Sequence, residues 1–264
     1  MLRGFFTGES IEYFSVIPYS KCKIIRQDII MREKFLPKSV IVYLVPYYAG
    51  ETVNLSRYAA SRDYHLYIRE LNLRLFELLK EIFPHNSFKG YGDSSPIDER
   101  HAALVLGLGM LGENQLLINE KYGSYVFIGE MITDIEPELL VAVDLKEIEH
   151  CSGCGRCKTS CPTGRLENRD KSCLSEITQR KGELSQDEIE IMKKCGTVWG
   201  CDLCQTSCPH NENTEITPIS FFSENRIENL SAELISSMSD EEFGKRAFSW
   251  RGRKTLERNL KYIK

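Results

Sequence analysis

Hydrophobic positions in the first half of the chain follow strand and helix periodicities in turn. The run SVIVYLVPYY (39–48) is β-branched and aromatic, and it predicts a buried strand. DERHAALVL (98–106) predicts a helix opened by acidic residues. A second helical pattern follows RDYH (62–65), with apolar residues at Leu71, Leu75, Leu78, Leu79 and Ile82. Because strands and helices interleave, we expect a mixed α/β domain, a sheet covered by helices, over residues 1–145.

The first domain also contains a predicted hairpin, and the pattern changes after residue 145. QLLINEKYGSYVFIGEMIT (115–133) alternates around a Lys-Tyr-Gly turn and predicts a β-hairpin. Residues 146–223 are rich in cysteine and poor in periodic segments, so we expect metal to replace much of their core. Residues 224–264 are helical and polar, and they end in a basic stretch. The predicted boundaries are therefore 1–145, 146–223 and 224–264.

Composition narrows the class of protein. The 264 residues are 42% hydrophobic and 27% charged, as in ordinary globular proteins, and a net charge of −4 decides nothing about nucleic acid. The N-terminus lacks the apolar core of a signal peptide, and the longest apolar run is too short to span a membrane. Nine of the ten cysteines lie between Cys151 and Cys208; Cys22 is expected to be a small buried hydrophobe. We expect a cytoplasmic protein with metal-bound thiolates and no membrane partner.

Two cysteine runs carry the most specific chemistry. CSGCGRCKTSCPTG (151–164) has the spacing C-x2-C-x2-C-x3-C-P, and CDLCQTSCPHN (201–211) repeats it except for the first cysteine, where Val198 stands. In two-cluster ferredoxins the fourth cysteine of each run serves the neighbouring [4Fe–4S] cluster. Structural zinc is the alternative, but two Cys-Pro endings and eight ligands favour clusters. The first set is Cys151, Cys154, Cys157 and Cys208; the second is Cys161, Cys201, Cys204 and either Cys173 or Cys195, between which spacing does not choose.

The segment GLGMLG (107–112) matches the dinucleotide-binding pattern G-x-G-x-x-G. That motif works only between a strand and a helix, whereas here a helix precedes it and a hairpin is expected to follow. We therefore reject a nucleotide site. Three glycines in six residues still allow the backbone to approach something flat or bulky.

Several stretches together resemble one enzyme family, the epoxyqueuosine reductases, which are cobalamin-dependent iron–sulfur enzymes of tRNA modification similar to reductive dehalogenases. The resemblance is carried by RYAASRDYH (57–65), GDSSPIDERHAALVLGLGMLGENQLLI (92–118), both cysteine runs with CLSEIT (173–178) between them, and RGRKTLERN (251–259). The run from Asp93 to Asn114 makes it specific. The implied fold is a cobalamin-binding α/β domain, a ferredoxin-like double-cluster domain and a short helical C-terminus.

The resemblance also implies roles for individual residues. It places Cys173 on the second cluster and makes Asp93 the proton donor beside the cobalt, although Gly-Asp-Ser-Ser-Pro is also a good turn sequence. The implied cobalamin neighbours are Arg57, Tyr58, Asp93, Gly107, Gly109, Gly112, Asn114, Ser175, Asp202 and Leu203. The chain departs from the family at Met110 and Glu113, where Trp and Lys are common. It also stops at Lys264, about where the family's helical-repeat domain would begin, so we expect a short form.

The implied function is reduction of epoxyqueuosine to queuosine in tRNA. Electrons from an external low-potential donor, such as a flavodoxin or ferredoxin, would pass through the two clusters to cobalamin. The alternatives are a cobalamin-dependent reductase of a small molecule, and a ferredoxin-like carrier or cobalamin-reactivating partner. Lys245–Lys264 holds eight Lys or Arg and one acid, and it predicts a weak, salt-sensitive contact with tRNA phosphates through Arg251, Arg253 and Lys254. The alternative there is an amphipathic helix with Phe248, Leu256, Leu260 and Ile263 inward.

Overall fold

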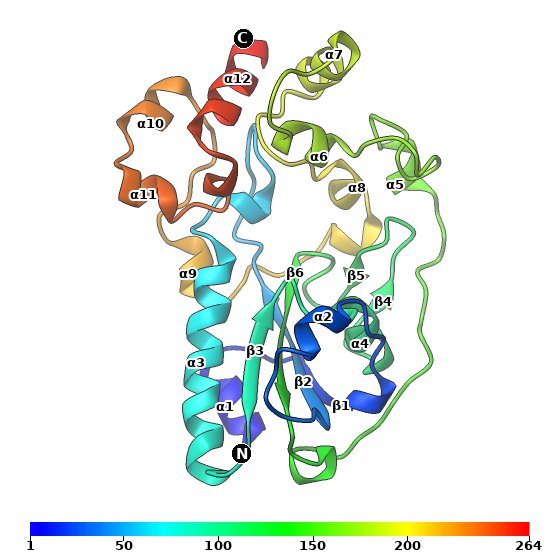
Figure 1. Ribbon diagram of the computed structural model, residues 1–264. Coiled ribbons are helices and arrows are strands. Elements are labelled where there is room, and N and C mark those ends of the chain that lie inside the picture. The colour runs from blue at the N-terminus through cyan, green and yellow to red at the C-terminus, as the bar shows by residue number, and fades with distance from the viewer. Residues whose placement is uncertain (264) are drawn as a thin grey trace. The chain divides into compact units, whose positions relative to one another are not determined.

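A computed structural model describes residues 1–263 (Figure 1). The chain divides into two compact units. The sheet unit comprises residues 1–46 and 65–152, and the cluster unit comprises residues 47–64 and the chain from Gly153 onward. Among residues 1–263, no helix is both long enough and apolar enough to cross a membrane.

The sheet unit is built on a four-stranded antiparallel sheet in the order β1-β2-β6-β3. Its strands are β1 (Phe14–Pro18), β2 (Ser39–Pro46), β3 (Phe88–Gly92) and β6 (Val126–Thr133). Every residue of β2 is buried, because this strand has a strand on either side and helices over both faces. The buried strand predicted from its β-branched residues is therefore confirmed.

Helices cover both faces of this sheet, as the periodicity predicts. The face of β2 that carries Val40, Val42 and Leu44 packs on α4 (Glu99–Val105). On the opposite face, the Tyr43 ring lies 5.3 Å from that of Phe6 in α1 (Leu2–Gly8), and its hydroxyl donates to Asn72 of α3 (Tyr64–Ile82) at 3.0 Å. Figure 1 shows α1 and α3 on one side of the strands and α4 on the other.

Both predicted helices begin and end close to the expected positions. In α3, Leu71, Leu75 and Leu79 are buried, whereas Ile82 is 46% exposed because it is the last residue of the helix. The N-terminus of α4 is capped by Asp98, whose carboxylate accepts a hydrogen bond from the His101 N–H at 3.0 Å.

The predicted hairpin over 115–133 is wrong. Strand β5 (Leu117–Ile118) pairs with β4 (Met110–Leu111), while β6 pairs with β2 and β3 in the four-stranded sheet. Only an isolated bridge joins Asn119 to Gly123 at the turn. Alternation along the chain identifies strands, but the choice of partner depends on which apolar faces meet in the folded protein. The segment GLGMLG instead contributes β4 itself, which pairs with β5.

The cluster unit consists of short helices, because two of its segments are organised around cysteines. Its α-helices are α5 (Arg156–Thr159), α6 (Leu174–Gln179), α7 (Gln186–Cys195), α8 (Leu203–Thr206), α9 (Ser220–Ser223), α10 (Ala232–Ser237), α11 (Asp240–Gly244) and α12 (Arg253–Ile263). The sheet unit also holds α2 (Gln27–Ile30). The 3-10 turns are η1 (Tyr19–Lys21), η2 (Arg57–Ala59), η3 (Pro137–Leu139), η4 (Pro209–Asn211) and η5 (Ser249–Arg251).

The main core of the cluster unit surrounds Trp199, which is fully buried with Phe248 and Leu256. Leu260 is also buried and Ile263 is partly buried, so the amphipathic alternative for the C-terminal stretch is confirmed. Of that stretch, Lys264 lies outside the described residues. A second, smaller core forms around Leu174, Ile177 and Met192 of α6 and α7.

The compact units differ from the predicted segments because residues 47–64 pack with the cluster unit. The Ser56 N–H donates to the Trp199 carbonyl at 2.7 Å, and the Val198 N–H donates to the Asn54 carbonyl at 2.6 Å. Residues 224–263 share the core of the same unit instead of forming a separate one. Conversely, residues 146–152 stay with the sheet unit, where the Cys151 N–H donates to the Leu111 carbonyl at 3.0 Å.

Candidate functional site

The two cysteine runs have the same local structure. Cys157 is the second residue of the one-turn helix α5, and Cys204 is the second residue of the one-turn helix α8. The two helices pack against each other. Val198, which stands where a symmetric second run would have cysteine, is completely buried in the core around Trp199. The second run therefore repeats the first in structure, with one ligand position used for packing.

The thiols predicted for the second cluster lie near one another. Burial raises the pKa of Cys204 to about 12, and the charges of Cys201, Cys173 and Cys161 add to this effect in that order. Burial also raises the pKa of Cys201 to about 12, with further contributions from Cys173 and Cys195. Thiolates crowded in a place of low dielectric repel each other, and bound iron relieves that repulsion. The donor set fits a cluster.

The surroundings of Cys161 favour its thiolate form. Burial alone would raise its pKa, but backbone groups of Leu166, Thr163 and Arg165 and the Thr163 hydroxyl lower it. The sulfur lies 3.7 Å from the Thr163 Oγ1. Such N–H and O–H donors are the interactions that tune the sulfur ligands of iron–sulfur clusters.

The first predicted set differs in exposure. Cys157 and Cys208 are buried, Cys151 is partly buried and Cys154 is exposed. All ten thiols are free of disulfides in the described part of the chain, and in residues 1–263 no three His, Cys, Asp or Glu side chains converge closely enough to hold a single metal ion. Cys22 packs on the sheet core, as expected of a small hydrophobe, and burial raises its pKa to about 12.

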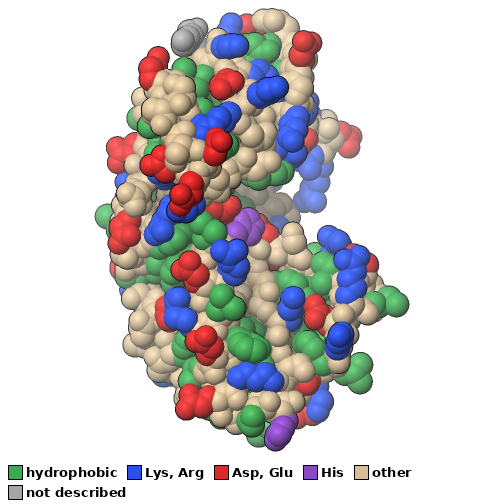
Figure 2. Space-filling view, turned by 60° about the vertical axis from the view of Figure 1, so that its left-hand side comes forward, with side chains coloured by type: hydrophobic (Ala, Val, Ile, Leu, Met, Phe, Trp, Pro, Cys, Tyr) green, Lys and Arg blue, Asp and Glu red, His purple; other side chains and the backbone are tan. Residues whose placement is uncertain are grey.

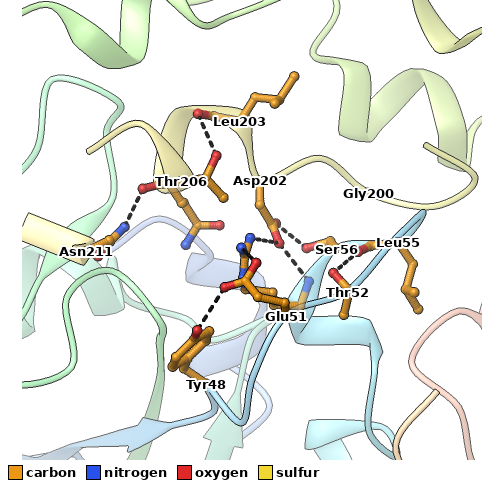
Figure 3. A network of polar contacts seen from close by, with 12 residues as sticks. Tyr48, Glu51, Thr52, Leu55, Ser56, Gly200, Asp202, Leu203, Thr206 and Asn211 are labelled. Carbon is orange, nitrogen blue, oxygen red and sulfur yellow. Dashed lines mark hydrogen bonds and ion pairs between the residues drawn. The ribbon is translucent and has the colours of Figure 1, made fainter. Parts of the chain in front are cut away.

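A buried polar network holds residues 47–64 against the second cysteine run (Figure 3). The Asp202 carboxylate accepts hydrogen bonds from the Ser56 hydroxyl and, at 2.7 Å, from the Arg57 N–H. The Arg57 guanidinium lies 3.4 Å from the same carboxylate and also pairs with Glu51, which accepts from the Tyr48 hydroxyl at 2.9 Å. The side chains of Arg57 and Asp202 are only 10% and 8% exposed. The network therefore fixes the backbone between Cys201 and Cys204.

A second set of contacts supports the same loop. The Tyr58 hydroxyl accepts from the Trp199 indole at 2.9 Å and from the Gln179 amide at 3.3 Å, and Gln179 also donates to the Ser175 hydroxyl at 3.0 Å. Gly200, with φ of 73°, precedes Cys201 directly, and a Cβ there would lie 2.5 Å from the Ser56 Cβ. Glycine is thus required at this position both by its backbone conformation and by the close approach of Ser56.

Asp93 lies at a pocket of the sheet unit. The pocket has a volume of about 580 Å³, and its lining includes Asp93, Ser95, Glu99 and Ser124. Asp93 and Ser94 both have left-handed backbones, with φ of 58° and 48°, a conformation that costs energy in residues other than glycine. The Asp93 carboxylate is half-exposed and lies 3.5 Å from the His65 imidazole. A strained loop thus presents a carboxyl group to a pocket.

Sequence reasoning missed two carboxyl groups near Asp93. Burial raises the pKa of Glu99 to about 7, with help from the negative charges of Asp93 and Asp98. Glu130 of β6 is completely buried, and burial raises its pKa to about 8. Ser95 faces this carboxyl and partly offsets the effect, but within residues 1–263 neither Glu130 oxygen has a hydrogen bond of acceptable geometry. The available signal was an acidic residue inside the otherwise uncharged strand VFIGEMIT.

The cysteine-rich region matches a known family model. Residues 150–211 match the 4Fe-4S double cluster binding domain, a span that contains both runs and Cys173. The prediction of two clusters is therefore confirmed at the level of the domain.

Curated relatives extend the match beyond the cysteines. The epoxyqueuosine reductase of Listeria monocytogenes is 34% identical over 207 residues, which cover 75% of this chain and 53% of that protein. That of Escherichia coli is 34% identical over 174 residues, covering 64% of this chain and 44% of that protein. By sequence, this chain is similar to the epoxyqueuosine reductases over about three quarters of its own length. It spans about half the length of the curated relatives it matches.

The fold of this epoxyqueuosine reductase relative is also that of solved structures. The epoxyqueuosine reductase from Streptococcus thermophilus aligns with a TM-score of 0.80 and 22% identity, over 99% of this chain and 79% of that one. An epoxyqueuosine reductase crystallised with a tRNA-Tyr epoxyqueuosine-modified stem loop aligns with a TM-score of 0.79 and 24% identity, over 99% and 79%. Both show a shared fold.

The predicted cobalamin neighbours of this epoxyqueuosine reductase relative fall in both units. Those in the sheet unit are Asp93, Gly107, Gly109, Gly112 and Asn114, and those in the cluster unit are Arg57, Tyr58, Ser175, Asp202 and Leu203. In the glycine loop a Cβ on Gly109 would lie 2.5 Å from the Ile118 carbonyl oxygen. The close approach that selects glycine there is thus made by the chain's own β5. Contact of these residues with cobalamin stays a prediction.

Proposed function

We propose that this protein is a cobalamin- and iron–sulfur-dependent oxidoreductase that reduces epoxyqueuosine to queuosine in tRNA. The observation that carries the proposal is Asp93, held by a strained backbone at a pocket in a chain that also contains a double-cluster domain. Relatives named epoxyqueuosine reductase support the substrate.

In this proposal the cofactors supply electrons and the protein supplies position and protons. Bound cobalamin, once reduced, would provide the nucleophilic metal chemistry that opens an epoxide. Asp93 would hold a proton at its carboxyl oxygen and donate it to the departing oxygen of the substrate. The eight cysteine thiolates would hold the clusters, and an external low-potential flavodoxin or ferredoxin would reload them. The network around Asp202 would keep the second cysteine run in place.

The cluster assignment gives a first prediction. Cys173→Ala should lose about half of the bound iron and sulfide, because it removes one of four thiolates that share a site. Cys195→Ala is the matched control and should keep both clusters, although Cys195 lies close enough to influence Cys201. Iron and sulfide analysis with EPR spectra after anaerobic reconstitution checks this. Loss of iron from the Cys195 variant alone would reverse the assignment.

The cations predicted to contact tRNA are not equally available. Arg253 donates to the carbonyls of Met238 and Ser239 at 2.8 and 3.1 Å and stacks 4.3 Å from the Phe243 ring, so it serves the fold. Lys254 is exposed, and with Lys181 and Arg251 it lines a pocket of about 710 Å³. On the face seen in Figure 2, Lys and Arg side chains lie among Asp and Glu side chains. Phosphate binding is therefore proposed for Lys181, Arg251 and Lys254.

A second prediction follows for tRNA. The double variant Lys181→Glu and Lys254→Glu should weaken tRNA binding at low salt, and the slope of log Kd against log salt should fall by about 1 for each phosphate that the variant no longer binds. Arg169→Glu, a reversal at another exposed cation of the unit, is the control. Fluorescence anisotropy at several salt concentrations measures this. Equal slopes in the wild type, the double variant and Arg169→Glu would show that this pocket does not bind tRNA.

The decisive experiment for the proposed function is reconstitution with iron, sulfide and cobalamin under anaerobic conditions, followed by turnover of tRNA that carries epoxyqueuosine. Formation of queuosine supports the proposal. Cobalamin binding without tRNA binding at low ionic strength would favour a small-molecule reductase. Two observations support that alternative: the Arg253 guanidinium binds a backbone carbonyl of its own unit, and Glu113 places an acidic residue in the glycine loop. Bound iron and sulfide without any cobalamin would favour an electron carrier.

A further inference from the structure

The wall of the pocket at Asp93 includes Val126, Phe127 and Ile128 of β6, and Glu130 does not line it. Alternate residues of a strand point to the same side, and Val126 and Ile128 line the pocket. Glu130 is the next residue on that side, and it pairs with Val42, whose side chain faces α4. The carboxyl group of Glu130 therefore lies on the α4 face of the sheet, two residues along β6 from Ile128, which lines the pocket.

Two side chains connect this buried carboxyl to the pocket. Ser95 and Glu99 both line the pocket, and both act electrostatically on Glu130. Glu99 is the first residue of α4 and is partly buried, and the charge of Asp93 acts on it directly. The order from the sheet outward is Glu130, then Ser95 and Glu99, then Asp93. Because the charges of these carboxyl groups act on one another, ionising all of them together is costly.

We propose that Glu99, which lines the same pocket as Asp93, forms a proton reserve that reloads Asp93 after each turnover. This inference rests on the proposed role of Asp93 as proton donor. When Asp93 has given up its proton, the Glu99 carboxyl transfers one to the Asp93 carboxylate, directly or through one water. Water in the pocket, which Glu99 lines, then restores the proton of Glu99. No electrons move in these steps.

The raised pKa values of Glu99 and Glu130, about 7 and about 8, allow both groups to hold protons near neutral pH. In each case burial is the largest cause, and the charges between the carboxyl groups add to it. In this proposal only Asp93 contacts the substrate. Glu99 and Glu130 are positioning residues, because they affect the reaction only through the proton of Asp93. Other titratable or charged groups that face these carboxyls or the pocket are Cys22, Arg26, His65, Tyr91, Asp98 and Arg100.

The first test does not depend on activity. Infrared titration of the reconstituted full chain should show protonated carboxyl groups at pH 7, and Glu99→Gln and Glu130→Gln should each remove part of that signal. In Asp93→Asn, the group assigned to Glu99 should titrate at lower pH, because a like charge has gone. Glu81→Gln, an exposed carboxyl on α3, is the control and should change nothing. A signal at pH 7 that survives Glu99→Gln, or an unchanged titration in Asp93→Asn, would overturn the proposal.

The second test uses turnover of tRNA that carries epoxyqueuosine. Glu99→Gln should lower kcat about tenfold at pH 6 to 7, where wild-type Glu99 holds its proton, with KM unchanged, and the deficit should shrink above about pH 8, where Glu99 is ionised in the wild type as well. A merely structural role would lower kcat at every pH. If Asp93→Asn is inactive while Glu99→Gln keeps the wild-type pH profile, the reserve is refuted and the proposed function stands. If wild type has no turnover, the proposed function fails and the infrared result alone decides on the shared protons.

Discussion

Asp93→Asn should keep both clusters and any bound cobalamin and lose turnover by about 10²-fold or more, the usual contribution of a general acid. The substitution is nearly isosteric, and it removes the only proton that the side chain could give to a leaving oxygen. Asparagine also tolerates the left-handed backbone that Asp93 adopts at φ of 58°, so the loop should keep its shape. The loss should therefore appear in kcat and leave KM for tRNA nearly unchanged.

The control for this variant is Asp144→Asn, the same chemical change at a side chain of the sheet unit that is 72% exposed and pairs with Lys146. It should have wild-type kcat, iron content and cobalamin content. A near wild-type rate in the Asp93 variant would exclude this carboxyl as the acid. Loss of iron or cobalamin from the variant would instead assign Asp93 to cofactor retention.

Glu130→Gln should make the protein more stable at alkaline pH, with a little less than half of that gain already present at pH 6. The folded pKa of Glu130, about 8, lies above the ordinary value of 4.5, chiefly because of burial. The stability that depends on its neutral form is fully present below about pH 4.5 and is lost as the pH rises through 8. The shift corresponds to about 5 kcal/mol once the carboxyl must ionise in the core. Glutamine stays neutral and removes this loss.

Urea unfolding under anaerobic conditions at pH 6 and pH 9 checks the prediction. The free energies of unfolding of wild type and Glu130→Gln should differ by about 2 kcal/mol at pH 6 and by about 5 kcal/mol at pH 9, in favour of the variant at both values. Glu81→Gln, at an exposed site, should follow wild type at both values. The same pH dependence in wild type and the Glu130 variant would mean that the native carboxyl is solvated or ion-paired.

Features set by local sequence could be predicted, and features set by distant contacts could not. Strand β2 and helix α3 carry strong periodic patterns, and the cysteine runs carry fixed spacings, so each was found from its own residues. The partner of β6 could not be found in this way, because alternation is the same whichever strand lies beside it. The association of residues 47–64 with Trp199 is likewise a long-range contact without a local pattern.

The candidate site shows the same division. The role of Asp93 was predicted from family resemblance and the cysteine ligands from spacing and that resemblance, all of which can be read along the chain. Glu99 and Glu130 were not, since an acidic residue is noteworthy only once burial is known. Arg253 shows the converse, because a cation assigned to phosphate from composition proves to bind backbone carbonyls of its own unit.

Residues 47–64 belong to the cluster unit but are separated from the rest of it along the sequence, and this affects both the synthesis of the protein and its division into fragments. During synthesis these residues leave the ribosome well before Val198 and Asp202, with which they bond, so the core of the cluster unit can close only when the chain is nearly complete. A gene fragment that begins at the first cysteine run would lack Ser56 and Arg57 and leave Asp202 buried without its donors. The cysteine-containing unit of this protein therefore cannot be excised as one continuous piece of polypeptide.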